Sequence, residues 1–375
     1  MIRTTAVFLR VVDWRASHKS DPVRRLRFLQ AATRPRHQEH GWLLALFPVV
    51  FLLGTTPGAP RIFTPIPSAA PQVVSSAIRV EAFPEIWLVD TTASSEIYSN
   101  GLRIDNRYSV SNTRRSYMAF SAVQPDDFRG ELRAGPAGIV FHTTESLQVP
   151  FEARKNATLE RIGESLLLYV KLRRAYNFVI DRFGRVYRIV VESDAANHAG
   201  YSVWADSEWV YLNLNQSFLA VSFETQTTPG QSEATVNPAQ IRSAAMLTEM
   251  LRKRYGIPAI DCVTHAQVSV NAVSLRIGSH FDWASSFPFE QLDLPDNYAL
   301  LLPAVSVFGF GFDSEFARQG GPRLVQEAQQ SNQIIQDHAT AAGMPISDYR
   351  KILQRGYRAR LAVAGHRSNR AEQEE

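Results

Sequence analysis

The stretch GIVFHTTE, residues 138–145, decides the fold. Its first four residues form a short apolar run that predicts a buried strand, and His142 stands directly at the end of that strand. Around it the chain alternates between strand-like and helix-like segments. The other expected elements are strands over 85–90, 102–110, 176–181, 185–191, 218–223 and 259–264, and helices over 159–172 and 238–255. This alternation predicts an α/β domain with a mixed central β-sheet flanked by helices.

The segment before this body differs from it in composition. Residues 1–56 are predicted to be a leader, and within it residues 42–54, WLLALFPVVFLLG, form an uncharged apolar run. A run of 13 residues is shorter than the roughly 20 of a membrane span, so we expect a signal or anchor segment, with a buried helix as the alternative. The Arg-rich sequence before this run favours export of the chain after it. Residues 57–79 are a Pro-rich linker.

The main domain is expected to span residues 80–300, with its core at 135–292. After it, residues 323–340 and 347–364 carry apolar side chains at helical spacing along one face. They predict a C-terminal helical appendage that occupies residues 301–375.

The composition narrows the class of protein. With 375 residues, 45% of them hydrophobic, the chain is long enough to bury a large core. The net charge of +4 arises in the leader, and no basic face interleaved with aromatic residues is visible, so we expect no nucleic-acid partner. We expect a monomer. Cys262 is the only cysteine, which excludes an internal disulfide and a Cys-rich zinc site, and we interpret it as a buried core thiol.

Four histidines of the body lie at strand ends or in loops, where α/β domains place functional groups. They are His142, His198, His265 and His280. Together with Asp282, His142 and His265 would supply the three ligands of a catalytic zinc and leave one position open for water. His280 is the rival for the third position. A structural role for each histidine is the alternative explanation.

Six pieces of residues 137–290 resemble, in the right order, the zinc amidases that cleave N-acetylmuramoyl-L-alanine. The pieces are IVFHTTE (139–145), AYNFVIDRFGRVYRIV (175–190), ANHAG (196–200), NQSFLAVSFE (215–224), THAQVS (264–269) and SHFDWASSFPF (279–289). That family shares its fold with peptidoglycan recognition proteins and phage T7 lysozyme. The resemblance implies zinc-dependent hydrolysis of the amide between N-acetylmuramic acid and L-alanine, with peptidoglycan or a muropeptide as the substrate.

The resemblance also implies residue roles. His142, His265 and Asp282 match the zinc ligands. His280 stands where the family usually has lysine, a position suited to stabilising the oxyanion of the tetrahedral intermediate. Tyr176 matches a hairpin tyrosine that orients water or substrate in some members, although a structural tyrosine is equally compatible.

The general base is less clear from the motifs. The alignment puts Ser222 where some relatives have a glutamate, and Glu224, two residues on, shares the same strand face. Glu224 is therefore the first candidate for the base and Glu145 the second.

Three further residues are expected to bind substrate, namely His198, Thr143 and Asn177. The segment NAVSLRIG, residues 271–278, looks like an inserted turn beside the cleft. We expect the protein in the cell envelope or periplasm, exported or anchored by the apolar segment 42–54. The alternative function is a non-catalytic peptidoglycan-binding module of the same fold.

Overall fold

The computed structural model describes residues 85–374, and for residues 366–374 it describes the backbone alone. The described residues belong to one compact unit. The predicted leader (1–56), its apolar segment (42–54) and the linker (57–79) lie outside them. None of the helices between residues 85 and 374 has the length and apolar character that crossing a membrane requires.

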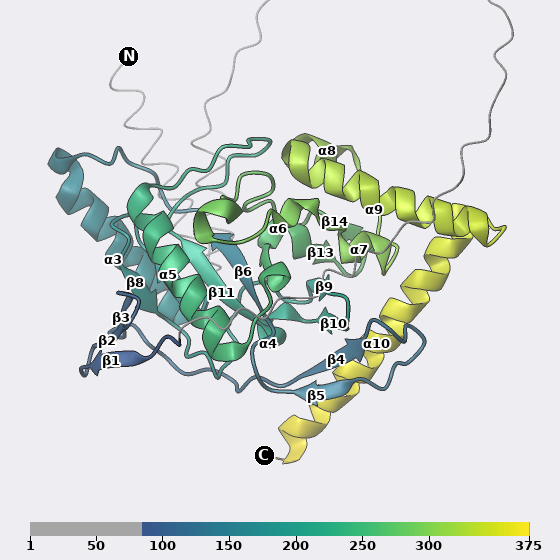
Figure 1. Ribbon diagram of the computed structural model, residues 1–375, viewed down its shortest axis with the longest axis horizontal. Coiled ribbons are helices and arrows are strands. Elements are labelled where there is room, and N and C mark those ends of the chain that lie inside the picture. The colour runs from purple at the N-terminus through teal and green to yellow at the C-terminus, as the bar shows by residue number, and fades with distance from the viewer. Residues whose placement is uncertain (1–84, 375) are drawn as a thin grey trace, which may run out of the picture. The chain divides into compact units, whose positions relative to one another are not determined.

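An eight-stranded mixed sheet forms the centre of the unit (Figure 1), as the alternation of elements predicted. In spatial order its strands are β1 (Leu88–Thr91), β2 (Ser95–Tyr98), β3 (Arg103–Asp105), β8 (Val186–Arg188), β7 (Phe178–Ile180), β11 (Phe218–Phe223), β6 (Gly138–Thr143) and β12 (Cys262–Thr264). The strands β7, β11, β6 and β12 run parallel to one another, so their carboxyl ends meet at one edge. The three N-terminal strands extend this sheet, and β2 pairs antiparallel with β1 and β3.

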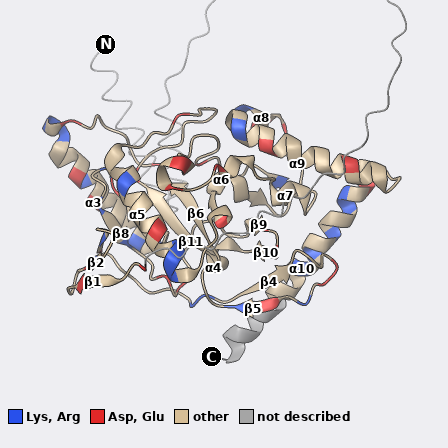
Figure 2. Ribbon diagram, viewed as in Figure 1, with Lys and Arg blue, Asp and Glu red and all other residues tan. Residues whose placement is uncertain are grey.

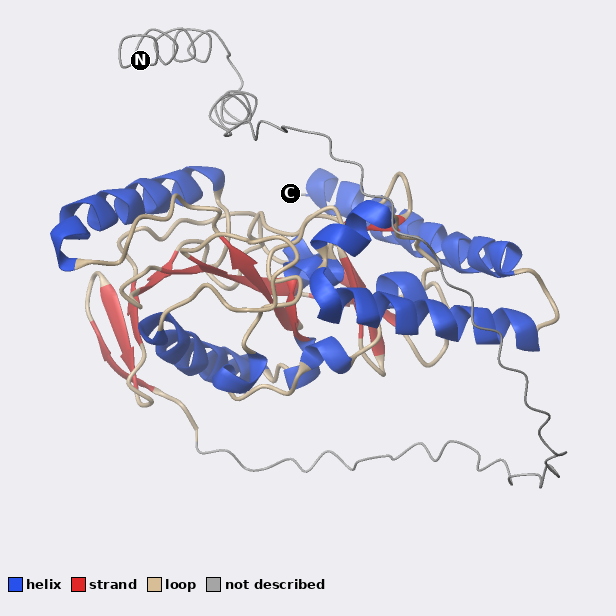
Figure 3. Ribbon diagram, turned by 90° about the horizontal axis from the view of Figure 1, so that it is seen from above, coloured by secondary structure: helices blue, strands red, loops and turns tan. Residues whose placement is uncertain are grey.

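Helices cover both faces of the sheet (Figure 3). The helix α5 (Pro238–Tyr255) packs on the face that carries Phe141, and α3 (Asn156–Arg173) packs on the other face against the β7–β8 hairpin. Because side chains alternate along a strand, His142 points away from the α5 layer. The bounds of α5 follow from its caps: Asn237 forms a capping box at its start, and Gly256, with φ +67°, ends it.

A second sheet was not predicted. It is antiparallel and consists of β5 (Glu131–Arg133), β4 (Tyr117–Ser121), β10 (Trp209–Leu212) and β9 (Val203–Ala205). Residues 117–120 of β4 are all buried and form a short apolar run. Such a run fits a buried strand and a buried helix segment equally, so periodicity alone does not identify β4.

The C-terminal helices share a core with the second sheet. They are α7 (Pro303–Ser306), α8 (Ser314–Gln319), α9 (Gly321–Ala341) and α10 (Ile346–Glu374). Leu324 and Tyr357 pack in one buried cluster with Phe120 and Val210. The segment predicted as an appendage is therefore an integral part of the described unit.

The remaining elements are short. They are α4 (Leu214–Ser217), α6 (His265–Val268), the hairpin β13 (Val270–Asn271) with β14 (Arg276–Ile277), and the 3-10 helices η1 (Ala153–Lys155), η2 (Ala259–Asp261), η3 (Phe289–Leu292) and η4 (Asn297–Ala299). The strand expected over 259–264 is therefore wrong in its first half, where η2 precedes β12. The strand expected over 102–110 is shortened to β3.

Candidate active site

His142 lies near the carboxyl end of the central strand β6 and is completely buried. On the neighbouring parallel strand β11, Ser222 pairs with His142 in register and therefore projects from the same face. The two central strands thus fix the position of the His142 imidazole before any ligand is bound.

His265 is the first residue of the helix α6, and the expectation that it ends a strand is wrong. The strand β12 stops at Thr264, whose hydroxyl accepts a hydrogen bond from the backbone N–H of Gln267. In return, the side-chain oxygen of Gln267 accepts from the backbone N–H of Thr264, at 3.0 Å. This capping box turns the chain from strand to helix at the sheet edge and holds His265 there.

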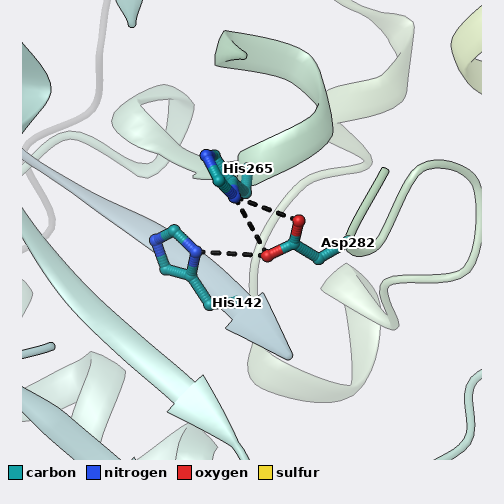
Figure 4. Close-up of side chains that lie close together, drawn as sticks. All are labelled: His142, His265 and Asp282. Atoms are coloured by element: carbon teal, nitrogen blue, oxygen red, sulfur yellow. Dashed lines mark hydrogen bonds and ion pairs between the residues drawn. The ribbon is translucent and has the colours of Figure 1, made fainter. Parts of the chain in front are cut away.

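Asp282 lies in the loop between β14 and η3 and faces both histidines (Figure 4). Its carboxylate oxygens lie 3.0 Å from Nδ1 of His265, and its Oδ2 lies 3.2 Å from Nδ1 of His142. The backbone N–H of Ala266 also donates to the carbonyl of Asp282 at 3.2 Å, which ties the two segments together. The structure therefore brings together the three residues that the motifs predicted as metal ligands, with their ligand atoms within 4.8 Å of one another.

Hydrogen bonds run from His142 to His198 and from His198 to the Leu214 carbonyl. They determine which nitrogen of His142 is free to bind a metal ion. The Leu214 carbonyl, which can only accept, lies 3.1 Å from Nε2 of His198, so that nitrogen carries the hydrogen. In neutral His198 the bare Nδ1 then accepts from Nε2 of His142, at 3.0 Å. Neutral His142 is left with a bare Nδ1 lone pair that faces the Asp282 carboxylate. Two acceptors face each other, and a cation between them satisfies both.

The protonation states agree with this assignment. Burial and the nearby His265 lower the pKa of His142 to about 4, so its imidazole is neutral at pH 7. Burial and the nearby His142 hold the pKa of His198 well below its usual range. Although burial opposes it, the proximity of His265 and its hydrogen bond to the carboxylate hold the pKa of Asp282 well below its usual range. Neutral imidazole and ionised carboxylate are the forms that bind a metal.

His280 and Tyr176 flank the three ligands. The ring of His280 stacks on that of His265 with centroids 4.6 Å apart. The desolvation that comes with this packing, together with the nearby His265, lowers the pKa of His280. The ring of Tyr176 lies 5.2 Å from that of His142. Burial and the Asp282 carboxylate raise the pKa of Tyr176, so its phenol remains a hydrogen-bond donor at neutral pH.

The two candidate general bases, Glu224 and Glu145, form their hydrogen bonds with groups other than the three ligands. Glu224 is 2% exposed, accepts a hydrogen bond from the backbone N–H of Arg182 at 3.1 Å and lies against Gly163 of α3. Glu145 is exposed and accepts hydrogen bonds from Thr143 and Thr227. Among the described contacts, none joins either carboxylate to the three ligands.

Two of the expected substrate-binding residues are engaged within the protein. Thr143 follows His142 on β6, points to the opposite face of the sheet and donates to Glu145. Asn177 is completely buried: its oxygen accepts from Arg115 and from the Ala220 backbone, and its nitrogen donates to backbone carbonyls. These contacts give Asn177 a structural place in the β7–β8 hairpin instead of the substrate-binding one expected for it.

The structure assigns His198 a contact with His142 that the motifs did not indicate. The motif placed His198 in the substrate cleft, whereas its ring bridges His142 and the Leu214 carbonyl. A sequence motif does not indicate which backbone carbonyl a histidine side chain will contact. The position of His198 between His142 and Leu214 could therefore not be predicted from the sequence.

One comparison with known proteins covers part of this site. Residues 132–277 match a family model described as N-acetylmuramoyl-L-alanine amidase. That match includes His142 and His265 and ends before Asp282, so the third candidate ligand rests on the motif and on the geometry. Among curated proteins, none matches the chain.

Several solved structures are similar at low identity. The N-acetylmuramoyl-L-alanine amidase LysC from Clostridium intestinale is 19% identical over 51% of this chain and 94% of its own, with a TM-score of 0.28. The Pseudomonas aeruginosa protein AmpDh3, in complex with anhydromuramic pentapeptide, is 18% identical over 52% of this chain and 72% of its own, with a TM-score of 0.32. The Escherichia coli amidase AmiD is 21% identical over 42% of this chain and 56% of its own, with a TM-score of 0.30.

The family predicted from the motifs is therefore confirmed for residues 132–277, which match the N-acetylmuramoyl-L-alanine amidase family.

Proposed function

We propose that this chain is a zinc-dependent N-acetylmuramoyl-L-alanine amidase that releases stem peptides from peptidoglycan. The observation that carries the proposal is the arrangement of His142, His265 and Asp282 at the carboxyl edge of the parallel strands, within 4.8 Å of one another. Two imidazoles and one carboxylate are a ligand set that suits zinc and leaves a coordination position open. When bound, zinc supplies a Lewis acid that polarises a carbonyl and lowers the pKa of water.

Three side chains around the ligands have separate roles in this proposal. The His280 imidazole, stacked on His265, is exposed, and we assign to it the support of the oxyanion that forms when water attacks the amide. The protonated phenol of Tyr176 can orient the substrate carbonyl by donating a hydrogen bond. His198 holds His142 in one tautomer through the hydrogen bond at 3.0 Å.

The positions of Ser222 and Glu224 favour a second candidate, a peptidoglycan-binding module that does not hydrolyse. A serine, not a carboxylate, stands beside His142 on β11. The nearest acidic residue on that strand face, Glu224, is bound to the Arg182 backbone. A site without a positioned base could bind the peptide and leave its amide intact.

Release of stem peptide from purified sacculi separates these two functions. The wild-type protein loaded with zinc is expected to release peptide, and a chelator or His265→Ala is expected to abolish release. The matched control is His338→Ala, which removes an exposed histidine of α9 and should release peptide at the wild-type rate. Zinc-loaded protein that sediments with sacculi but releases no peptide from them, or from soluble muropeptides, would establish the binding module instead.

A location in the cell envelope is part of the same proposal. Two observations support it, namely the apolar run at 42–54 after an Arg-rich leader and the peptidoglycan substrate implied by the family. Fractionation of cells that produce the full chain, with and without residues 1–56, tests this location.

A further inference from the structure

The C-terminal helix α9 lies outside the segment that matches the amidase family, yet it contacts both segments that carry His265 and Asp282. The first contact runs through Gln267, two residues after His265. The Gln267 side-chain nitrogen donates to Oε1 of Glu327 on α9 at 2.8 Å, and both residues are at most 1% exposed. The Gln267 oxygen at the same time accepts from Thr264 and maintains the cap that places His265.

The second contact runs through Ser285, three residues after Asp282 and completely buried. Its hydroxyl donates to the Gly320 carbonyl at 2.7 Å and accepts from the backbone N–H groups of Arg323 and Leu324 at 3.0 and 3.1 Å. These are donors in the first turn of α9 that have no partner within the helix.

The start of α9 is shaped to receive this serine. Gly321 has φ +69°, and a Cβ built on it would lie 2.8 Å from the Ser285 hydroxyl oxygen. Only glycine allows this approach without displacing the loop that carries Asp282.

Apolar packing joins the same elements. Ala266, the neighbour of His265, and Ala284, two residues after Asp282, belong to one buried cluster with Leu324 and Ala328 of α9. One helix therefore touches both ligand-bearing segments by hydrogen bonds and by packing, while His142 is fixed independently by the central strands.

We propose that α9 is a positioning element of the metal centre, in which Ser285 and Glu327 set the placement of Asp282 and His265. The inference rests on the metal centre of the proposed function and concerns its assembly. Removing a residue that supports a metal ligand from outside the coordination shell typically weakens metal affinity by about 10- to 100-fold. Because α9 itself lies outside the segment that matches the amidase family, these contacts give the C-terminal extension a part in the function of the domain.

A pair of buried serines tests the proposal. Ser331, which lies on α9 and is completely buried, accepts from the Leu302 backbone N–H and donates to the Glu327 carbonyl, both at 2.7 Å. Among the described hydrogen bonds, none joins the Ser331 side chain to a ligand-bearing segment. Ser285→Ala and Ser331→Ala each remove one buried hydroxyl that serves a backbone N–H, so both should lower the melting temperature of the zinc-free protein. Only Ser285→Ala should raise the zinc dissociation constant, by about 10-fold or more in a chelator competition.

A substitution at Glu327 gives a second, independent measurement. Burial raises the pKa of Glu327 well above its usual range, so Glu327→Gln keeps a neutral side chain with an acceptor oxygen for Gln267. Glu327→Gln should bind zinc as the wild type does, whereas Glu327→Met, which lacks the acceptor, should bind it more weakly. The absorption spectrum of the Co²⁺-loaded protein should shift in Glu327→Met and Ser285→Ala only.

The outcomes separate this inference from the proposed function, because zinc affinity is read without any substrate. Equal losses of affinity in Ser285→Ala and Ser331→Ala would overturn the inference, as would a wild-type protein that binds no zinc. A protein that shows the expected difference in affinity but releases no stem peptide would retain the inference and lose the amidase function.

Discussion

His198 is the residue whose role the structure changes most. The motif suggested a substrate contact, and the structure places its ring between His142 and the Leu214 carbonyl, at 3.0 and 3.1 Å. We expect His198→Phe, which keeps a ring but removes the acceptor, to raise the zinc dissociation constant by about 10- to 100-fold. The reason is that His142 would no longer be held in the tautomer that exposes Nδ1.

The control for this prediction is Asn197→Ala at the neighbouring exposed position. It should leave zinc affinity unchanged in the same chelator competition. If His198→Phe binds zinc as tightly as Asn197→Ala, His198 does not determine the tautomer of His142.

Site residues were predictable where a motif and a strand end coincide, as for His142. The motif also indicated Asp282, although the loop before it is long. The motifs did not predict the roles of Glu224, Asn177 and Thr143. These roles depend on which neighbouring groups form hydrogen bonds with each side chain in the folded protein. For Asn177 those neighbours are the Arg115 guanidinium and backbone groups of Val190 and Ala220, which come from three separate segments, and no spacing in the sequence indicates that they meet.

The hairpin β13–β14 links the active-site loop to the C-terminal extension. The backbone N–H of Ile277 donates to the Gly311 carbonyl at 3.0 Å, and that of Gly311 donates to Leu275 at 2.9 Å. Ile277 is 7% exposed and belongs to the cluster that contains α9. The segment 271–278, expected to be an inserted turn, is therefore a hairpin that is bonded to residues after 300.

Two adjacent residues of β14 should differ sharply in their contribution to stability. Ile277→Ala is expected to lower the free energy of unfolding by about 2–4 kcal/mol, because it leaves a cavity in the shared cluster. Arg276→Ala removes an ion pair with Asp313 whose side chains are 55% and 46% exposed, and it should cost less than about 1 kcal/mol. Urea unfolding of both variants measures the difference. Similar losses would show that the hairpin is not anchored by Ile277.

Elements with strong local end signals were predictable from the sequence, and α5 is the clearest case. Its start has Pro238 and the Asn237 cap, and its end has Gly256. The change from β12 to α6 escaped prediction because the apolar run continues up to Thr264, and only the capping contact with Gln267 shows that the chain has turned into a helix. The second sheet was not predicted because its strands are short and because its central pairing, β4 with β10, joins residues far apart in the sequence.

Basic and acidic segments are intermixed over the described ribbon (Figure 2). The response of the unit to pH should therefore depend on individual buried groups more than on a charged face. Asp261 is such a group. It ends η2, at the edge of the sheet opposite to His142, is 1% exposed, and accepts a hydrogen bond from the Trp204 indole at 2.9 Å.

Burial and the nearby Asp206 raise the pKa of Asp261 to about 8. In the unfolded chain an aspartate ionises near about pH 4, so between about pH 4 and 8 unfolding releases a proton from this group. Its contribution to stability is therefore complete below about pH 4 and is lost as the pH rises toward 8. The wild-type free energy of unfolding should fall across this range by up to about 1.4 kcal/mol per pH unit through Asp261 alone.

Asp261→Asn removes this titration and keeps an acceptor oxygen for the Trp204 indole. The difference in unfolding free energy between Asp261→Asn and the wild type should therefore grow in favour of the variant from pH 5 to pH 8, as measured by urea unfolding at several pH values. All other titrating groups are common to both proteins, so their contributions cancel in the difference. Asp293→Asn, at an exposed position with φ +56° that asparagine tolerates, is the matched control and should run parallel to the wild type. If the Asp261→Asn curve also runs parallel to that of the wild type, Asp261 is already ionised in the folded protein at pH 5. The carboxylate before β12 would then be a buried charge.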